Sequence, residues 1–215
     1  MMRYFISNLL IFSCILISFE GCKQDIHASK DFNAVINDQE NGYKQCKSVN
    51  GVMVTVVYTP PEYVALKKME ASDLKGEMVY DSILENERLF ASFMMVFGPD
   101  ESKGNRNDIM YDGINNFKEY AERSLTLNFD MENNVELNVN QLAYKPALSS
   151  LENTYGLSKD RKVNLVFAPL TSKMEIAEAT NFDFVYSDET FGVGTLHFYF
   201  DKKKMQQQIP VIAMR

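Results

Sequence analysis

The chain of 215 residues contains no tryptophan, two histidines and three cysteines. Carbohydrate sites rely on broad aromatic platforms, so the lack of tryptophan counts against glycosidases and lectins and leaves only tyrosine-based ones open. Zinc sites of the usual kind need three or four histidine or cysteine ligands, which is more than these counts provide within the domain. The sequence also lacks a strand-flanked G-x-S-x-G turn, a glycine-rich phosphate loop and an H-E-x-x-H pair. We therefore expect a protein that is not an enzyme and holds no cofactor.

Basic clusters are scarce as well. The chain has 22 basic and 29 acidic residues, and its net charge is −7. The longest basic run is the three lysines at residues 202–204, a pattern typical of a solvated strand edge. Phosphate contacts depend on clustered lysine and arginine, so we expect no nucleic-acid partner.

The N-terminal residues have the order of a secretory signal peptide. One basic residue, Arg3, precedes an apolar stretch at residues 4–19, which is shorter than the roughly 20 residues of a membrane-spanning helix. A glycine then directly precedes Cys22, and this pair resembles the cleavage site of bacterial lipoproteins. The Phe-Glu pair at residues 19–20 departs from the commonest pattern in a way that resembles lipoproteins of the Bacteroidota.

The resemblance implies a signal peptide at residues 1–21 and acyl chains, such as palmitate, on Cys22. A plain secretory signal with an incidental cysteine, and an uncleaved anchor, are the alternatives. Two or three acyl chains bind a membrane stably, because each buried methylene contributes about 0.8 kcal/mol. No aspartate of the inner-membrane retention kind follows Cys22, so we expect the outer membrane. Residues 23–25, Lys-Gln-Asp, partly resemble a Bacteroidota surface signal, and both faces of that membrane stay open.

The polar composition of residues 22–50 predicts the lipidated cysteine and a flexible tether. Cys46 lies in this segment, and it is the only other cysteine after cleavage, so no internal disulfide can form. We expect Cys46 to be a passive thiol.

Residues 51–215 are expected to form one domain, because their apolar residues suit a single core. Alternation of apolar and polar residues predicts strands, and many short strands with few helices favour an antiparallel β-sandwich of about eight strands. The expected strands are residues 52–58, 77–84, 88–97, 125–131, 135–139, 163–167, 182–186 and 196–200, with 209–214 as a ninth at an edge. A hairpin turn is expected at residues 131–135, and short crossover helices at 59–69 and 112–122.

Three aromatic residues are candidates for contact with a ligand or partner. Phe191 lies near the tip of the loop at residues 187–194, where it either anchors a partner or folds back over the core. Tyr144 and Tyr155 are candidates for an exposed patch. Ser82, within Asp-Ser-Ile, resembles the acceptor of Bacteroidota O-glycosylation.

Carboxylates and the single histidine of the domain give weaker signals. The loop from Asp100 to Asp108 carries five oxygen-bearing side chains, which permits calcium, but its spacing does not match a calcium loop and favours a polar connection. The acidic pairs at residues 188–189 and at 130 and 132 adjoin expected turns and are interpreted as solvated. His197 is expected on the polar side of a strand, in a structural role.

These observations predict a membrane-anchored lipoprotein that acts as an interaction or assembly module with other envelope proteins, as an accessory of a secretion or other envelope-spanning machine. Its layout is similar to small β-sandwich lipoproteins that tie secretion machinery to the outer membrane, such as the type VI secretion lipoprotein. One alternative is a surface lipoprotein that binds a glycan or host protein. The other is a hydrolase whose carboxylates meet in a cleft.

Overall fold

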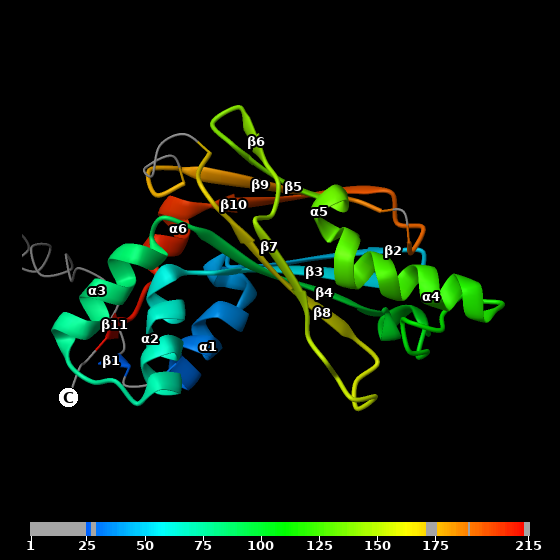
Figure 1. The fold of residues 1–215 in the computed structure, drawn as a ribbon, viewed down its shortest axis with the longest axis horizontal. Helices are drawn as coiled ribbons and strands as arrows, with labels where there is room; N and C mark the ends of the chain where they lie inside the picture. Colours follow the sequence, from blue (N-terminus) through cyan, green and yellow to red (C-terminus); the bar gives the residue numbers. More distant parts are fainter. Residues whose placement is uncertain (1–24, 27–28, 171–175, 189, 213–215) are drawn as a thin grey trace, which may run out of the picture.

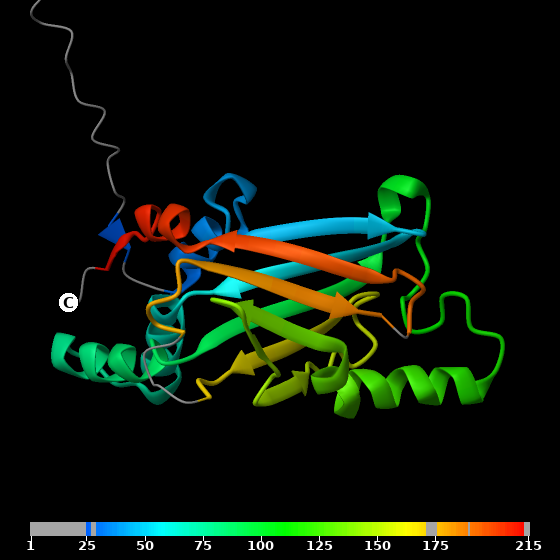
Figure 2. The same ribbon diagram turned by 90° about the horizontal axis from the view of Figure 1, so that it is seen from above.

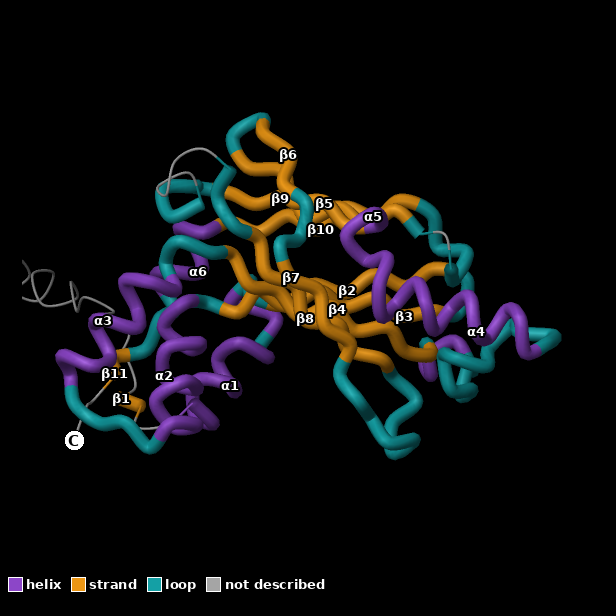
Figure 3. Tube along the Cα trace, viewed as in Figure 1, coloured by secondary structure: helices purple, strands orange, loops and turns teal. Residues whose placement is uncertain are grey.

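The computed structural model describes residues 25–26, 29–170, 176–188 and 190–212. Within these residues, nine strands form two antiparallel sheets that pack face to face. The predicted β-sandwich is confirmed (Figure 1). Helices gather mainly at the two ends of the strands (Figure 3).

The first sheet has five strands in the order β2-β3-β4-β8-β7. Their bounds are β2 Lys44–Val49, β3 Val52–Thr59, β4 Ala91–Pro99, β7 Leu148–Leu151 and β8 Arg161–Phe167. Strand β4 lies at the centre, with Phe93 opposite Tyr58 on one side and Leu165 on the other.

The second sheet has four strands in the order β10-β9-β5-β6. Their bounds are β5 Val135–Val139, β6 Leu142–Tyr144, β9 Asn181–Ser187 and β10 Thr195–Asp201. Two further short strands, β1 Asp25–Ile26 and β11 Val211–Ile212, pair in parallel at one end of the molecule (Figure 2). Within the expected ninth strand at 209–214, residues 211–212 form β11, and residues 213–214 lie outside the described residues.

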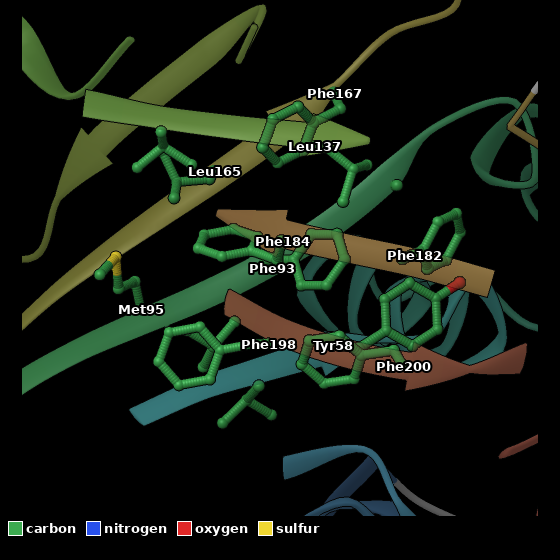
Figure 4. Close-up of a cluster of buried hydrophobic side chains, with 14 of the residues drawn as sticks. Tyr58, Phe93, Met95, Leu137, Leu165, Phe167, Phe182, Phe184, Phe198 and Phe200 are labelled. Carbon is green, nitrogen blue, oxygen red and sulfur yellow. The ribbon is translucent and has the colours of Figure 1, made fainter. Parts of the chain in front are cut away.

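The core between the sheets is built largely from aromatic rings. The Phe93 ring centroid lies 5.1 Å from that of Phe184 and 5.4 Å from that of Phe200, both of which come from the opposite sheet. Figure 4 shows these rings meeting between the strands. Along β9, Phe182, Phe184 and Tyr186 are buried while the residues between them are not. The period of two in the sequence therefore identifies the face of β9 that packs into the core.

The helices are short and lie beside or beyond the sheets. Their bounds are α1 Ser29–Asn37, α2 Pro61–Ser72, α3 Glu77–Glu87, α4 Phe117–Leu125, α5 Met131–Asn134 and α6 Lys202–Gln207. Two 3-10 turns, η1 Gln39–Asn41 and η2 Glu101–Lys103, and a π-helical turn, η3 Thr126–Asp130, complete the elements. No helix within the described ranges is long and apolar enough to cross a membrane.

Two expected strands are wrong, because each segment is helical. In the segment expected as strand 77–84, Tyr80 and Leu84 are buried in α3 while Met78 is exposed. In segment 125–131, Leu127 and Met131 are buried. Apolar residues two apart share one face of a strand, and those four apart also share one face of a helix. These two sequences fit both patterns, and packing selects the helix. The hairpin expected at 131–135 is α5 instead.

The expected tether at residues 22–50 is wrong from Ser29 onward. Helix α1 buries Phe32 and Ile36 in the core, and β2 pairs with β3 along its length. Tyr43 is also fully buried, and its hydroxyl donates to the Met205 carbonyl at 2.6 Å. The described domain therefore begins well before Gly51. The composition predicts a tether because the few apolar residues of α1, at helical spacing, lie among many polar ones.

The two expected helices exist with shifted starts. Helix α2 begins at Pro61 rather than at 59, and its N-cap, Pro60, makes no side-chain cap. Helix α4 begins at Phe117 rather than near 112. Its N-cap is Asn116, whose side-chain oxygen accepts from the Glu119 amide at 3.1 Å.

Candidate functional site

A cavity of about 180 Å³, partly open to solvent, lies where the first turn of α2 meets the start of α6. Its walls are mostly aromatic and apolar, with contributions from Tyr58, Phe90 and Met205. Ligand pockets in proteins typically combine such walls with a few polar groups. The volume is below the range of about 300–1,000 Å³ that suits drug-sized molecules, so this cavity fits a small molecule.

Three charged side chains reach the cavity from separate elements. Glu62 lies in the first turn of α2, Arg88 follows α3, and Lys202 begins α6. An Arg88 guanidinium nitrogen lies 3.8 Å from the Glu62 carboxylate, at the outer limit of an ion pair. Burial raises the pKa of the Glu62 carboxyl, while its own backbone amide, Arg88 and Lys202 act to lower it.

Lys202 is held by backbone oxygens rather than by a carboxylate. Its ammonium donates to the carbonyls of Ile176 at 3.0 Å and Ala177 at 2.6 Å. The ammonium also lies 5.5 Å from the centroid of the Phe182 ring. Burial lowers the pKa of the Lys202 ammonium, and the negative charge of Glu62 acts in the other direction.

Tyrosines surround this charged group. Burial, and then the negative charge of Glu62, raise the pKa of the Tyr43 and Tyr58 hydroxyls well above the usual range for tyrosine. The same two causes raise the pKa of Tyr80. These tyrosines therefore stay protonated at neutral pH, and Glu62 is the only carboxylate among the residues described at the cavity wall. Glycoside hydrolysis needs a pair of carboxylates, which this cavity does not provide.

A second hollow is an open groove of about 590 Å³ between α4 and the loop that joins β7 to β8. We call it the aromatic groove, because Tyr111, Tyr120 and Tyr155 line it. The rings of Tyr111 and Tyr120 stack with centroids 5.2 Å apart, and Phe117 stacks on Tyr120 at 6.1 Å.

Several of these rings face solvent. The exposed fraction is 62% for Tyr111, 80% for Phe117 and 83% for Tyr155. The neighbouring charge of Tyr120, and a hydrogen bond with it, raise the pKa of the Tyr111 hydroxyl. Exposed aromatic side chains that gather on one surface mark sites of interaction.

The floor of the aromatic groove is fixed by charged hydrogen bonds. Arg161 donates to the Asp108 carboxylate at 2.9 Å and to the carbonyls of Ser158 and Asp160, both at 2.8 Å. From α4, Arg123 donates to the carbonyls of Ile109 at 2.6 Å and Asp112 at 2.8 Å. The helix and the loops are thereby tied together, so the groove is preformed.

The three predicted contact residues have different fates. Tyr155 lies in the aromatic groove and is exposed. Tyr144 is 1% exposed, so its prediction as part of an exposed patch is wrong. Phe191 folds back over the core, where its ring stacks on Phe97 at 4.8 Å and lies 4.9 Å from the Arg123 guanidinium. It is therefore no free anchor for a partner.

Cys22 lies outside the described residues, so its predicted lipidation stays a prediction. Ser82 is exposed and lies on helix α3, where the sequence predicted a strand. Its glycosylation likewise stays a prediction. Cys46 is an exposed free thiol on β2, and its sulfur accepts a hydrogen bond from Thr55 at 3.3 Å.

The polar side chains of the loop from Asp100 to Asp108 hold the loop in place. The Asp100 carboxylate accepts hydrogen bonds from the hydroxyls of Ser48 and Ser102. These bonds, led by the one from Ser102, lower the pKa of Asp100. Asp108 pairs with Arg161. Within the described part of the chain, no three histidine, cysteine, aspartate or glutamate side chains gather in a group that could hold a metal ion.

The other carboxylates and the histidine also make structural contacts. Asp188 accepts from the Tyr186 hydroxyl and from three backbone amides of its own loop, so it is not a solvated turn residue as interpreted. Glu189 lies outside the described residues. Asp130 and Glu132 are exposed. His197 pairs with Asp183 at 3.1 Å on the outer face of the second sheet.

Sequence reasoning missed both hollows. Glu62, Arg88 and Lys202 are far apart along the chain, and only the fold brings them together. Phe117 and Tyr120 carried a detectable signal, because aromatic residues three apart in a polar helix lie on one face and can stack.

No family model matches the chain, and no curated protein matches it. Among solved structures, the chain is similar to a novel protein of unknown function from Burkholderia pseudomallei K96243. The two are 10% identical with a TM-score of 0.36, over 83% of this chain and 86% of the other.

Proposed function

We propose that this chain is a non-catalytic interaction module of the cell envelope, anchored in the outer membrane by acyl chains on Cys22. It docks other envelope proteins through the aromatic groove, as an accessory of a secretion or other envelope-spanning machine. The observation that carries the proposal is a set of exposed rings: Tyr111 and Tyr155 line the groove, and Phe117 lies next to it on α4.

The position of the groove supports this role. Figures 1 and 2 both place α4, which forms one wall of the groove, at the opposite end of the molecule from β1. Strand β1 begins at Asp25, three residues after Cys22. An anchor at Cys22 therefore leaves the groove directed away from the membrane, where a partner can reach it.

The character of the groove favours a protein partner. Interfaces rely on a few aromatic anchors, especially tyrosine, surrounded by polar groups. The rings stand beside Asn128, Glu152 and Asn153, which also line the groove and supply such a rim.

Replacing Tyr111 and Tyr155 together with alanine tests the proposal. Both rings are exposed, so the double variant should fold normally, as judged by its thermal midpoint. After mild crosslinking in native membranes, the wild type should bring down a fixed set of envelope proteins. Loss of two aromatic anchors should reduce that recovery about tenfold or more, since each contributes roughly 1–2 kcal/mol.

Tyr199→Ala is the matched control. Tyr199 is 64% exposed, comparable to Tyr111, but lies on β10 outside the groove. Recovery with this variant should equal that of the wild type. Equal recovery with the groove variant would refute docking through the groove.

A glycan ligand is the second candidate, favoured by the exposed Tyr155 face beside amide side chains at residues 128 and 153. It predicts binding to a glycan panel that Tyr155→Ala abolishes, together with protease sensitivity of the protein on intact cells. Absence of glycan binding by the wild type would remove this candidate and leave the first one standing.

A further inference from the structure

The partly open cavity at the start of α2 is separate from the aromatic groove and supports an inference of its own. It lies at the end of the molecule that holds α1, α2, α3 and α6, whereas α4 lies at the other end (Figure 1). Its volume of about 180 Å³ and its apolar walls suit a molecule of few atoms.

The charges at the cavity do not balance. Glu62 supplies one negative charge, while Arg88 and Lys202 supply one positive charge each. One unit of positive charge is therefore left over among the described wall residues. The Lys202 ammonium has neutral partners, the carbonyls of Ile176 and Ala177, which accept two of its hydrogen bonds without cancelling its charge.

Donors for an anion are also present. An ammonium has three protons, and two of those on Lys202 go to the two carbonyls. Arg88 has five donors in a planar fork, and its pairing with Glu62 is a single contact at 3.8 Å. The fork geometry of arginine matches a carboxylate. A doubly charged anion is disfavoured, because Glu62 repels it.

We infer that the cavity binds a small monocarboxylate with an apolar body, its carboxylate between Lys202 and Arg88 and its body against Tyr58, Phe90 and Met205. The carboxylate neutralises the excess charge, and the apolar body replaces water at the aromatic walls. A cation of the same shape is rejected by the two basic groups.

The test uses thermal unfolding and calorimetry of the purified full chain at pH 7. Benzoate and isobutyrate are compared with benzyl alcohol, benzylamine and sodium chloride at equal ionic strength. We expect the carboxylates to raise the thermal midpoint in a concentration-dependent manner and the other compounds to leave it unchanged. Stabilisation by benzylamine, or none by carboxylates beyond that of chloride, overturns the inference.

Variants separate a specific site from a general charge effect. Lys202→Met keeps the apolar stem and should weaken carboxylate binding about tenfold to a hundredfold, the loss expected for a charged hydrogen bond. Lys203→Met, at the exposed neighbouring position on α6, should have no effect. Equal weakening by both variants overturns the inference.

Glu62→Gln provides a test in the opposite direction. It removes the one negative charge and should tighten carboxylate binding about threefold or more. A merely structural role for these residues predicts that both Lys202→Met and Glu62→Gln weaken binding. If Lys202→Met does not fold, the sign of the Glu62→Gln effect decides alone, and weaker binding contradicts the inference.

Discussion

At the scale of single residues, two buried tyrosines differ in whether the hydroxyl has a hydrogen-bond partner. The Tyr43 hydroxyl donates to the Met205 carbonyl and so joins the residue before β2 to α6. The Tyr80 hydroxyl is buried with no hydrogen-bond partner among the described residues. A buried polar group without a partner costs free energy, so these two hydroxyls should have opposite effects on stability.

The replacement of each tyrosine by phenylalanine tests this contrast. Tyr43→Phe should lower the free energy of unfolding by about 1 kcal/mol, the net worth of a buried hydrogen bond. Tyr80→Phe should leave it unchanged or raise it. Urea denaturation of the two variants provides the measurement. A loss with Tyr80→Phe as large as that with Tyr43→Phe would show that the Tyr80 hydroxyl is satisfied.

At the scale of elements, the docking of α1 on α2 replaces the tether that the composition predicts. The Glu70 carboxylate of α2 accepts from the Ser29 amide at 2.7 Å and from the Ser29 hydroxyl at 2.5 Å, at the first residue of α1. These hydrogen bonds satisfy a free amide at the helix start. They also lower the pKa of Glu70.

This contact makes the stability of the domain depend on pH. A carboxyl whose pKa is lower in the folded state adds stability above its unfolded pKa of about 4.3, and this is lost as the pH falls through the folded pKa. Glu70→Gln should therefore unfold more easily than the wild type at pH 7, and the difference should shrink below about pH 4. Ser29→Ala should show the same trend. A difference independent of pH would mean that α1 is not held by this contact.

The elements that sequence alone predicted are those with one consistent period. Phe182, Phe184 and Tyr186 alternate with less apolar residues and fit only a period of two. The structure has strand β9 there. Residues 77–84 and 125–131 contain spacings of both two and four, and only the packing partners decide between strand and helix. Short strands such as β6 and β7 have too few residues to show a period. The charged cavity was beyond prediction, since its groups meet only through the fold.

At the scale of the whole molecule, our proposal assigns membrane anchoring and partner docking to opposite ends. Cys22 is the predicted point of lipidation, and β1 lies near it in sequence and far from α4 in space (Figure 2). The β-sandwich between them has a core of interlocking rings, such as Phe93 with Phe184. Under the proposal, such a scaffold would hold the groove at a fixed orientation to the membrane.

The most direct test of the account is photo-crosslinking from the groove in native membranes. A photo-reactive benzoylphenylalanine in place of Phe117, with Cys22 intact, should give discrete adducts with the same envelope proteins in every preparation. The same group in place of Tyr199 should give none of them, and Cys22→Ser should release the protein from membranes and abolish the Phe117 adducts. Adducts from Tyr199 but not from Phe117 would contradict the account.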